Sequence, residues 1–252
     1  MKAKGTRLLA ILALATVLTI PGTAFPQIAS AYSCYNCYGI VDWTGNVDGA
    51  FTSIVYLPIL SPGDNHANIE LWLIGPVPSG QVCPINGQNR SACWIELGAK
   101  AGPPQCNMGT SCYFWNDLRP CNGCYNNYFT HWWSNIPSGD LNYQVDLRVE
   151  RQDSSDFALF LQSRSYILQN TSTGNSMKQN HIEVGSEVQG STGAAIGATT
   201  FQNNQWKPVG ANYYNFQTNS GSATVNSPIV AYWYAVPVPG NNGGIWYTYC
   251  PC

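Results

Sequence analysis

Two glutamates stand in the same setting, each with a glycine two positions away in a stretch that reads as a β-strand. Glu187 follows Gly185 in HIEVGSEVQG (residues 181–190), and Glu96 precedes Gly98 in CWIELG. Because side chains alternate along a strand, each glutamate shares one face with its glycine. A glycine at that position predicts open space beside the carboxyl, where a purely structural strand more often carries a bulky or β-branched residue.

Two carboxyls on such strand faces could meet across the concave side of a sheet. The same residues also fit two independent surface glutamates, and alternation alone leaves both interpretations open.

The segments that must position these glutamates read as short strands separated by turns. The clearest signal spans residues 141–150, where every second residue from Leu141 to Val149 is apolar. In residues 67–74, Ile69, Leu71 and Leu73 are expected to face inward, and Asn68, Glu70 and Trp72 to face outward. Further strands are expected over residues 50–60, 92–98, 113–115, 157–161, 166–169, 181–189, 198–201 and 229–236, with a compact cysteine turn at RPCNGC. Many short strands without a long helical pattern predict an all-β fold, a single antiparallel β-sandwich or jelly roll of the concanavalin-like kind, stapled by disulfides.

The N-terminal segment, residues 1–31, reads as a secretory signal peptide. It has a positive start, an apolar run over residues 8–20 and a small-residue cleavage site, Ala-Ser-Ala. About 13 apolar residues cannot span roughly 30 Å of hydrocarbon as a helix, so a membrane anchor is the weaker interpretation. We therefore expect one secreted, extracellular domain over residues 32–252.

Composition limits the partners and cofactors. The formal net charge is −2 and 10% of residues are charged, without a basic stripe, so neither nucleic acid nor an anionic membrane is an expected partner. All ten cysteines follow residue 31, which in an oxidising compartment predicts up to five disulfides. The C-x-x-C pairs at residues 34–37 and 121–124 make zinc the rival interpretation, but secretion argues against it, and no metal or cofactor is expected. One plausible pairing joins Cys250 or Cys252 to the N-terminal cysteine pair.

Three short motifs resemble one peptidase family. WIELG around Glu96 resembles the I-E-x-G element of neprosin-type glutamic peptidases, and EVGSEV around Glu187 resembles their G-G-E-V element. Between them, NGCYNNY (residues 122–128) is similar to the family's G-C-Y-N element. More distantly, the arrangement resembles the eqolisin peptidases, which have a glutamine in place of Glu96. This chain departs from the family at Ser186, which replaces the second glycine of G-G-E-V, and at Ala99-Lys100, where the family usually has an aromatic residue.

The resemblance implies a β-sandwich with a long groove across its concave sheet. It also implies hydrolysis of peptide or protein substrates at acidic pH, without a covalent intermediate or a metal, and with a preference for cutting after proline. One glutamate, ionised, would activate the attacking water, and the other, protonated, would donate a hydrogen bond to the developing oxyanion and help to protonate the leaving amine. Two nearby carboxyls cannot both ionise cheaply, so they would share a proton over an acidic range of pH. By analogy with eqolisins, Glu187 is assigned as the base and Glu96 as the acid and oxyanion donor, and the reverse assignment stays open. Candidates for lining the groove are Trp72, Trp94, Trp115 and Tyr125, each of which also fits ordinary packing.

Other functions remain possible at this stage. A non-catalytic secreted β-sandwich could bind carbohydrate through exposed aromatics such as Trp72 and Tyr125, or could serve as a surface-structural protein. Two carboxyls also suit a glycosidase, although the motifs favour peptides. Asp117 could be a secondary acid or a turn residue that pairs with Arg119, and His131 reads as structural.

Overall fold

The computed structural model of the chain describes residues 34–107, 110–178, 181–190, 194–218, 221–226, 234–241 and 243–250. Within them the secondary structure is β-strand apart from one 3-10 turn, η1 (Ser138–Asp140). No helix among these residues is long and apolar enough to cross a membrane. The predicted signal peptide, residues 1–31, lies outside the described residues. The expected fold class, an antiparallel all-β sandwich with disulfides, is confirmed.

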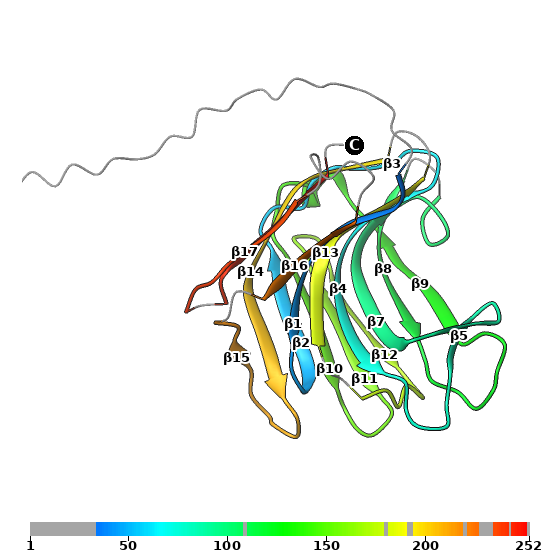
Figure 1. Cartoon of the computed structure of the whole chain (residues 1–252). Coiled ribbons are helices and arrows are strands. Elements are labelled where there is room, and N and C mark those ends of the chain that lie inside the picture. The colour runs from blue at the N-terminus through cyan, green and yellow to red at the C-terminus, as the bar shows by residue number, and fades with distance from the viewer. Residues whose placement is uncertain are drawn as a thin grey trace, which may run out of the picture.

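One sheet has seven strands and carries both glutamates that the sequence singled out. In chain order its strands are β1 (Cys34–Thr44), β4 (His66–Pro76), β7 (Ala92–Ala101), β8 (Ser111–Leu118), β9 (Tyr128–Asn135), β13 (His181–Gly190) and β16 (Ser222–Asn226). Across the sheet they run in the order β16-β1-β13-β4-β7-β8-β9. Figure 1 shows these strands side by side in a strongly curved sheet. Strand β4, which the sequence predicted, therefore lies at the middle of the sheet, between β13 and β7.

The second sheet has nine strands and covers one face of the first. Its strands are β2 (Val47–Ile54), β3 (Leu60–Pro62), β10 (Val145–Arg151), β11 (Phe157–Gln162), β12 (Ile167–Ser172), β14 (Ala194–Pro208), β15 (Asn215–Phe216), β17 (Tyr234–Val238) and β18 (Ile245–Cys250). Their order is β12-β11-β10-β2-β14-β18-β17, and β3 and β15 both pair with β14. A small hairpin of β5 (Cys83–Ile85) and β6 (Gln88–Arg90) extends beside the β8–β9 edge of the first sheet (Figure 1).

The core lies between the two sheets and is built by alternation. Ile69, Leu71 and Leu73 of β4 are fully buried in it, as predicted. The second sheet contributes the alternate apolar residues of β10 and β11, which are also buried: Val145, Leu147, Val149, Phe157, Leu159 and Leu161. Because side chains alternate, Asn68, Glu70 and Trp72 of β4 point to the opposite face of the seven-stranded sheet. We call that face the groove face.

Two predicted strands proved shorter than their patterns. The strand expected over residues 141–150 begins only at Val145, because residues 138–140 form the 3-10 turn and Asn142 adopts a left-handed φ of 63°. The apolar alternation runs on through this turn, so the pattern overestimates the strand. The strand expected over residues 50–60 is divided into β2 and β3, with Pro58, which has no backbone N–H, between them.

Other strands were underestimated or missed. The three-residue strand expected at 113–115 is the eight-residue β8. Strands β1 and β9 were not predicted at all. The sequence of β9, YFTHWWSN, lacks a regular apolar–polar alternation, and β1 contains a register shift between Cys34 and Cys37. Edge strands and bulged strands weaken the period-two pattern on which such predictions depend.

Three disulfides are present among the described side chains: Cys83–Cys93, Cys106–Cys112 and Cys121–Cys124. Cys37 is disulfide-bonded as well. Since the C-x-x-C pair at residues 121–124 is closed by its own disulfide, it is not a zinc site. The predicted link to Cys250 or Cys252 falls on side chains outside those described.

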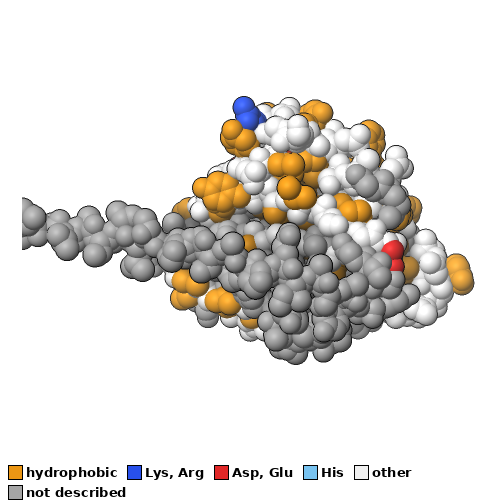
Figure 2. Space-filling model, turned by 90° about the horizontal axis from the view of Figure 1, so that it is seen from above, with side chains coloured by type: hydrophobic (Ala, Val, Ile, Leu, Met, Phe, Trp, Pro, Cys, Tyr) orange, Lys and Arg blue, Asp and Glu red, His pale blue; other side chains and the backbone are white. Residues whose placement is uncertain are grey.

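Charge is sparse on the surface. Among the described side chains seen from above in Figure 2, most are hydrophobic or uncharged, in keeping with a sequence in which 10% of residues are charged. A cluster of carboxyls on one face of a sheet is therefore a distinctive feature of this molecule.

Candidate active site

Glu96 and Glu187 line the same groove on the groove face. The groove has a volume of about 230 Å³, and its wall is completed by Tyr38, Ile40, Trp72, Ile74, Trp94 and Glu183. Glu96 comes from β7 and Glu187 from β13, which are separated by β4. The two glutamates that the alternation singled out are thus brought together in one groove.

Glu70 of β4 lies between the strands that carry this pair. Across the backbone it is paired with Gly185 of β13 on one side and Gly98 of β7 on the other. Glu70 is fully buried, and its Oε1 accepts a hydrogen bond from Nδ2 of Asn68. Burial, together with the charges of Glu96 and Glu187, raises the pKa of Glu70 well above its usual range. The strand alternation predicted that Glu70 faces outward, but no motif marked it as a site residue.

Gly98 and Gly185 have a different role from the one their spacing suggested. A Cβ on Gly98 would lie 2.0 Å from the carbonyl oxygen of Ile69, and one on Gly185 would lie 2.5 Å from that of Gly39. These distances are shorter than any real Cβ contact. The glycines are therefore required because the neighbouring backbones approach closely, and the open space expected at these positions does not exist.

Glu96 is held by three side-chain donors. Trp72 donates its indole N–H to Oε2 at 2.7 Å, and the hydroxyl of Tyr128 donates to Oε1 at 3.0 Å. Nδ2 of Asn116 also donates to Oε1. Burial and the charge of Glu96 raise the pKa of Tyr128 far above its usual value, so its phenol remains a donor. Since Glu96 is only 8% exposed, this set of donors fits an ionised carboxyl, which can only accept hydrogen bonds.

Glu187 is in the opposite electrostatic situation. Burial and the charge of Glu96 raise the pKa of Glu187 to about 7, against the opposing effect of Lys100. Glu187 therefore keeps its proton at pH values where an ordinary glutamate has lost it.

Lys100 brings a positive charge into the same cluster. It is 4% exposed, and its Nζ lies 5.6 Å from the centre of the Phe114 ring. Burial lowers the pKa of Lys100, whereas the nearby glutamates act in the opposite direction. Burial and the charge of Lys100 also lower the pKa of His66 to about 3, so this histidine is neutral at mildly acidic pH.

The four aromatic residues proposed for the groove divide evenly. Trp72 and Trp94 line it. Trp115 does not, because neighbouring residues of β8 alternate: Asn116 faces the groove, and Trp115 faces the core, where it is 2% exposed and stacks on His131 at 3.7 Å. Tyr125 is also outside the groove. It lies in a loop, is 72% exposed, and covers Gly87 of the small hairpin.

Asp117 lies in the interior rather than in the groove, and the partly exposed His131 stacks on Trp115, away from the groove. Asp117 is fully buried in β8, not in a turn, and accepts hydrogen bonds from Nε of Arg119 at 2.6 Å and from the hydroxyl of Ser172 on the second sheet. The predicted pairing with Arg119 is thus present, in a strand instead of a turn. Because Asp117 connects the two sheets, a structural role explains it.

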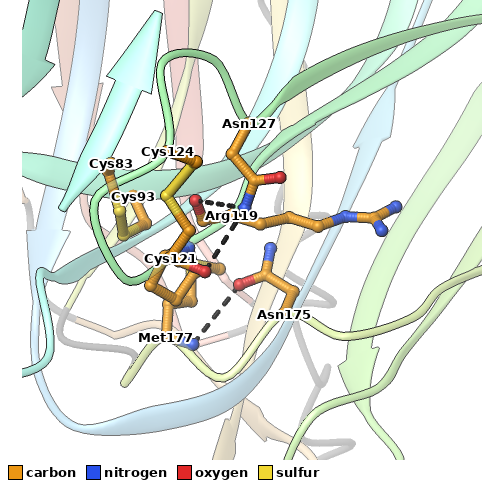
Figure 3. The surroundings of a disulfide bond; sticks show 9 residues. Cys83, Cys93, Arg119, Cys121, Cys124, Asn127, Asn175 and Met177 are labelled. Atoms are coloured by element: carbon orange, nitrogen blue, oxygen red, sulfur yellow. Dashed lines mark hydrogen bonds between the residues drawn. A yellow bond between two sulfur atoms is a disulfide. The ribbon is translucent and has the colours of Figure 1, made fainter. Parts of the chain in front are cut away.

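The loop before β9 positions Tyr128 next to Glu96. Figure 3 shows how it is closed: Cys121 and Cys124 form a disulfide, and Nδ2 of Asn127 donates to the carbonyl oxygens of Arg119 and Pro120, at 3.0 and 3.3 Å. The motif NGCYNNY ends on Tyr128, so it could have identified this residue as a partner of the site. For Glu70, Lys100 and Asn116 the signal lay in the strand alternation, which places all of them on the groove face.

Among the described residues, no three His, Cys, Asp or Glu side chains are arranged to hold a metal ion. The site consists of carboxyls with amide, indole and phenol donors and one buried lysine. Such a set can hold a proton on one carboxyl and a negative charge on another, and can orient a water between them.

No family model and no curated protein matches the chain. Among solved structures, it is similar to scytalido-glutamic peptidase with a peptide-based transition-state analogue (TM-score 0.54) and with a transition-state analogue inhibitor (TM-score 0.53). Each match has 11% identity and covers 86% of this chain and 100% of the other. SCP-B, an eqolisin-family peptidase in complex with the tripeptide Ala-Ile-His, has 9% identity, a TM-score of 0.49 and the same coverage. At this identity the likeness to scytalido-glutamic peptidase shows that the chain has the fold of a glutamic peptidase.

Proposed function

We propose that this chain is a secreted, neprosin-like glutamic endopeptidase that hydrolyses peptide bonds at acidic pH with Glu96, Glu187 and an activated water. The observation that carries the proposal is that both carboxyls line one groove in opposite electrostatic surroundings. The fold shared with scytalido-glutamic peptidase, which was crystallised with a peptide-based analogue, supports a peptide or protein as the substrate. The disulfides support an extracellular location.

The surroundings of the pair favour Glu96 as the base and Glu187 as the acid. This is the reverse of the assignment that analogy with eqolisins suggested. Three donors stabilise a negative charge on Glu96, whereas Glu187 holds its proton to about pH 7. A general base must be ionised and a general acid protonated at the working pH, and below pH 7 these residues meet that requirement in this order.

In the proposed reaction, Glu96 takes a proton from water while the water oxygen attacks the scissile carbonyl carbon. Protonated Glu187 donates a hydrogen bond to the oxyanion that develops on the carbonyl oxygen. When the carbon–nitrogen bond breaks, the proton that Glu96 removed passes to the leaving amine. Glu96 is then ionised and Glu187 protonated, as at the start.

The test is proteolysis of an unfolded protein substrate at acidic pH by the wild type and by Glu96→Gln, Glu187→Gln and the double variant. We expect Glu96→Gln to reduce the rate about 10²- to 10⁴-fold, because the amide cannot accept the proton from water. Glu150→Gln is the matched control, since Glu150 pairs with Lys207 on the second sheet. Circular dichroism shows whether each variant is folded, and a folded double variant that still cleaves would refute the proposal.

The two role assignments are separated by the shape of the pH profile. With Glu187 as the acid, the wild-type rate should fall as the pH rises through about 7, where Glu187 loses its proton. Glu187→Gln can still donate a hydrogen bond, so it should retain part of the rate and lose this alkaline limb. If Glu187→Gln is inactive and Glu96→Gln retains activity, the roles are the other way round.

Carbohydrate binding by exposed aromatic rings receives no comparable support. Trp72 is 7% exposed and its N–H is engaged by Glu96, so its ring offers no stacking surface. Tyr125 is exposed but lies outside the groove, against the small hairpin.

A further inference from the structure

Glu70 is a third carboxyl of the cluster, and the proposed reaction does not use it. It lies on β4, the strand between the strands of Glu96 and Glu187, and is fully buried. A carboxyl in that position is costly if it serves only as packing, because a leucine of similar size would avoid burying polar atoms. Its contacts therefore call for a functional explanation.

The two oxygens of Glu70 are in different situations. Oε1 accepts a hydrogen bond from Asn68. Oε2 is buried, and no described group donates to it. A buried carboxylate oxygen without a donor loses its hydration without compensation. The same oxygen is satisfied if it carries a proton and donates to an acceptor.

Glu96 is the acceptor within reach. Glu70 pairs with Gly98 on β7, so Glu96, two residues before Gly98, is its diagonal neighbour on the groove face, and long side chains in diagonal positions can reach each other. Glu96 is surrounded by donors, and a protonated Glu70 would be a fourth. The charged groups around Glu70 fit this arrangement: Glu96 and Lys100 on β7, Glu187 on β13, and neutral His66 on β4 itself. With Glu70 and Glu187 protonated, the charge on Glu96 is balanced by Lys100.

We propose that Glu70 is a positioning residue that remains protonated and donates a hydrogen bond to Glu96, which keeps Glu96 ionised and leaves the exchangeable proton on Glu187. This role rests on the proposed peptidase function. It assigns Glu70 no contact with substrate or water, and it makes the site a chain of three carboxyls in which the middle strand controls the charge of the base.

Two substitutions separate this role from its alternatives. Glu70→Gln replaces the O–H donor with an N–H donor of the same size, so it should keep the rate within about threefold of wild type, because the net difference between two neutral donors is small. Glu70→Leu fills the space without a donor. It should lose about 10- to 100-fold in kcat, with KM nearly unchanged, and the acidic limb of its pH profile should move to higher pH. Glu150→Gln again controls for the loss of a carboxyl elsewhere.

Two outcomes would overturn the proposal. If Glu70→Gln is as impaired as Glu70→Leu while both fold, Glu70 acts as a charged partner of Lys100. If both variants match the wild type in rate and pH profile, Glu70 has no influence on Glu96.

A measurement that does not depend on catalysis distinguishes a failure of this proposal from a failure of the proposed peptidase function. Infrared spectra near pH 7.5 are recorded in a Glu187→Gln background, because Glu187 itself is still partly protonated at this pH. They should contain the C=O band of a protonated carboxyl, which is absent when Glu70→Gln is added and retained when Glu150→Gln is added. If the wild type does not cleave peptides but the background shows this band, the proposed function fails and the protonation of Glu70 stands. If the band is absent from the background, the role of Glu70 fails whatever the activity.

Discussion

The indole nitrogen of Trp72 donates a 2.7 Å hydrogen bond to Oε2 of Glu96, and the two residues are also backbone partners in the β4–β7 ladder. The backbone pairing fixes where the indole lies, and the indole fixes one oxygen of the carboxyl. Glu96 is thereby oriented by a neighbour that has almost no freedom to move.

Trp72→Phe should keep the aromatic packing and remove this donor. Hydrogen bonds to charged groups contribute about 1.5–3 kcal/mol, so we expect kcat to fall about 10- to 100-fold, with a small change in KM. Steady-state kinetics on a peptide substrate measure both constants. Trp94→Phe is the matched comparison, because it removes from the same groove an indole N–H that donates to no described group. Equal losses of kcat in both variants would contradict the specific role of the Trp72 N–H.

Stability should depend on pH through Glu187. Its pKa is about 7 in the folded protein against an ordinary value of 4.5, so the folded state binds more protons than the unfolded state between these values. The contribution is fully present below about pH 4.5 and is lost as the pH rises through 7, by an amount on the order of 3 kcal/mol. Denaturant unfolding from pH 4 to 8 measures it.

Glu187→Gln should flatten this pH dependence, because the amide does not titrate. As the pH rises from 4.5 to 8, the free energy of unfolding of the variant should therefore fall less than that of the wild type. A pH dependence that is the same in both proteins would mean that Glu187 has an ordinary pKa.

Gly98→Ala should destabilise the fold. The added Cβ would lie 2.0 Å from the carbonyl oxygen of Ile69, so the β4–β7 ladder would have to open. Overpacking of this kind costs about 1–3 kcal/mol and occasionally more. Gly139→Ala is the control, because no described atom beyond its chain neighbours lies within 4 Å of the Cβ it adds. Urea unfolding midpoints compare the two, and equal midpoints would show that the strands can separate without cost.

The disulfide Cys121–Cys124 should affect the site through Tyr128. Replacing both cysteines with serine opens the loop that precedes β9, at a cost of about 2 kcal/mol for so short a loop. We expect kcat to fall because the hydrogen bond from Tyr128 to Glu96 is less well maintained. Tyr128→Phe should reduce kcat similarly. The triple variant should be no worse than Tyr128→Phe, whereas additive losses of kcat would indicate that the disulfide acts independently.

The sequence predicted the fold class, and indicated the face of the sheet on which Glu96 and Glu187 lie, for the same reason. In β4, β7 and β13, apolar and polar residues alternate cleanly, so the face of Glu96 and Glu187 could be read directly. The overestimated strand at 141–150 had equally clean alternation, but a pattern of side chains does not register the left-handed φ of Asn142.

What the sequence could not provide is the order of strands in the sheet. Glu70 has the same alternation signal as Glu96, yet its importance comes from lying between β7 and β13, which are distant in the chain. Trp115 fitted either the groove or ordinary packing for a related reason, since β8 was recognised only in part and its face could not be read. The roles of Gly98 and Gly185 also depend on the neighbouring backbone, which no local pattern contains.

The central position of β4 links the candidate active site to the accuracy of folding. A one-residue slip of β4 would turn Asn68, Glu70 and Trp72 into the core between the sheets. The same slip in β7 or β13 would bury Glu96 with Lys100, or Glu187, among apolar side chains, at a cost of several kcal/mol for each unpaired charge. These polar side chains therefore disfavour sheets in which β4, β7 or β13 is out of register. In a refolding mixture, the active fraction would count the molecules in which three strands have found their correct register.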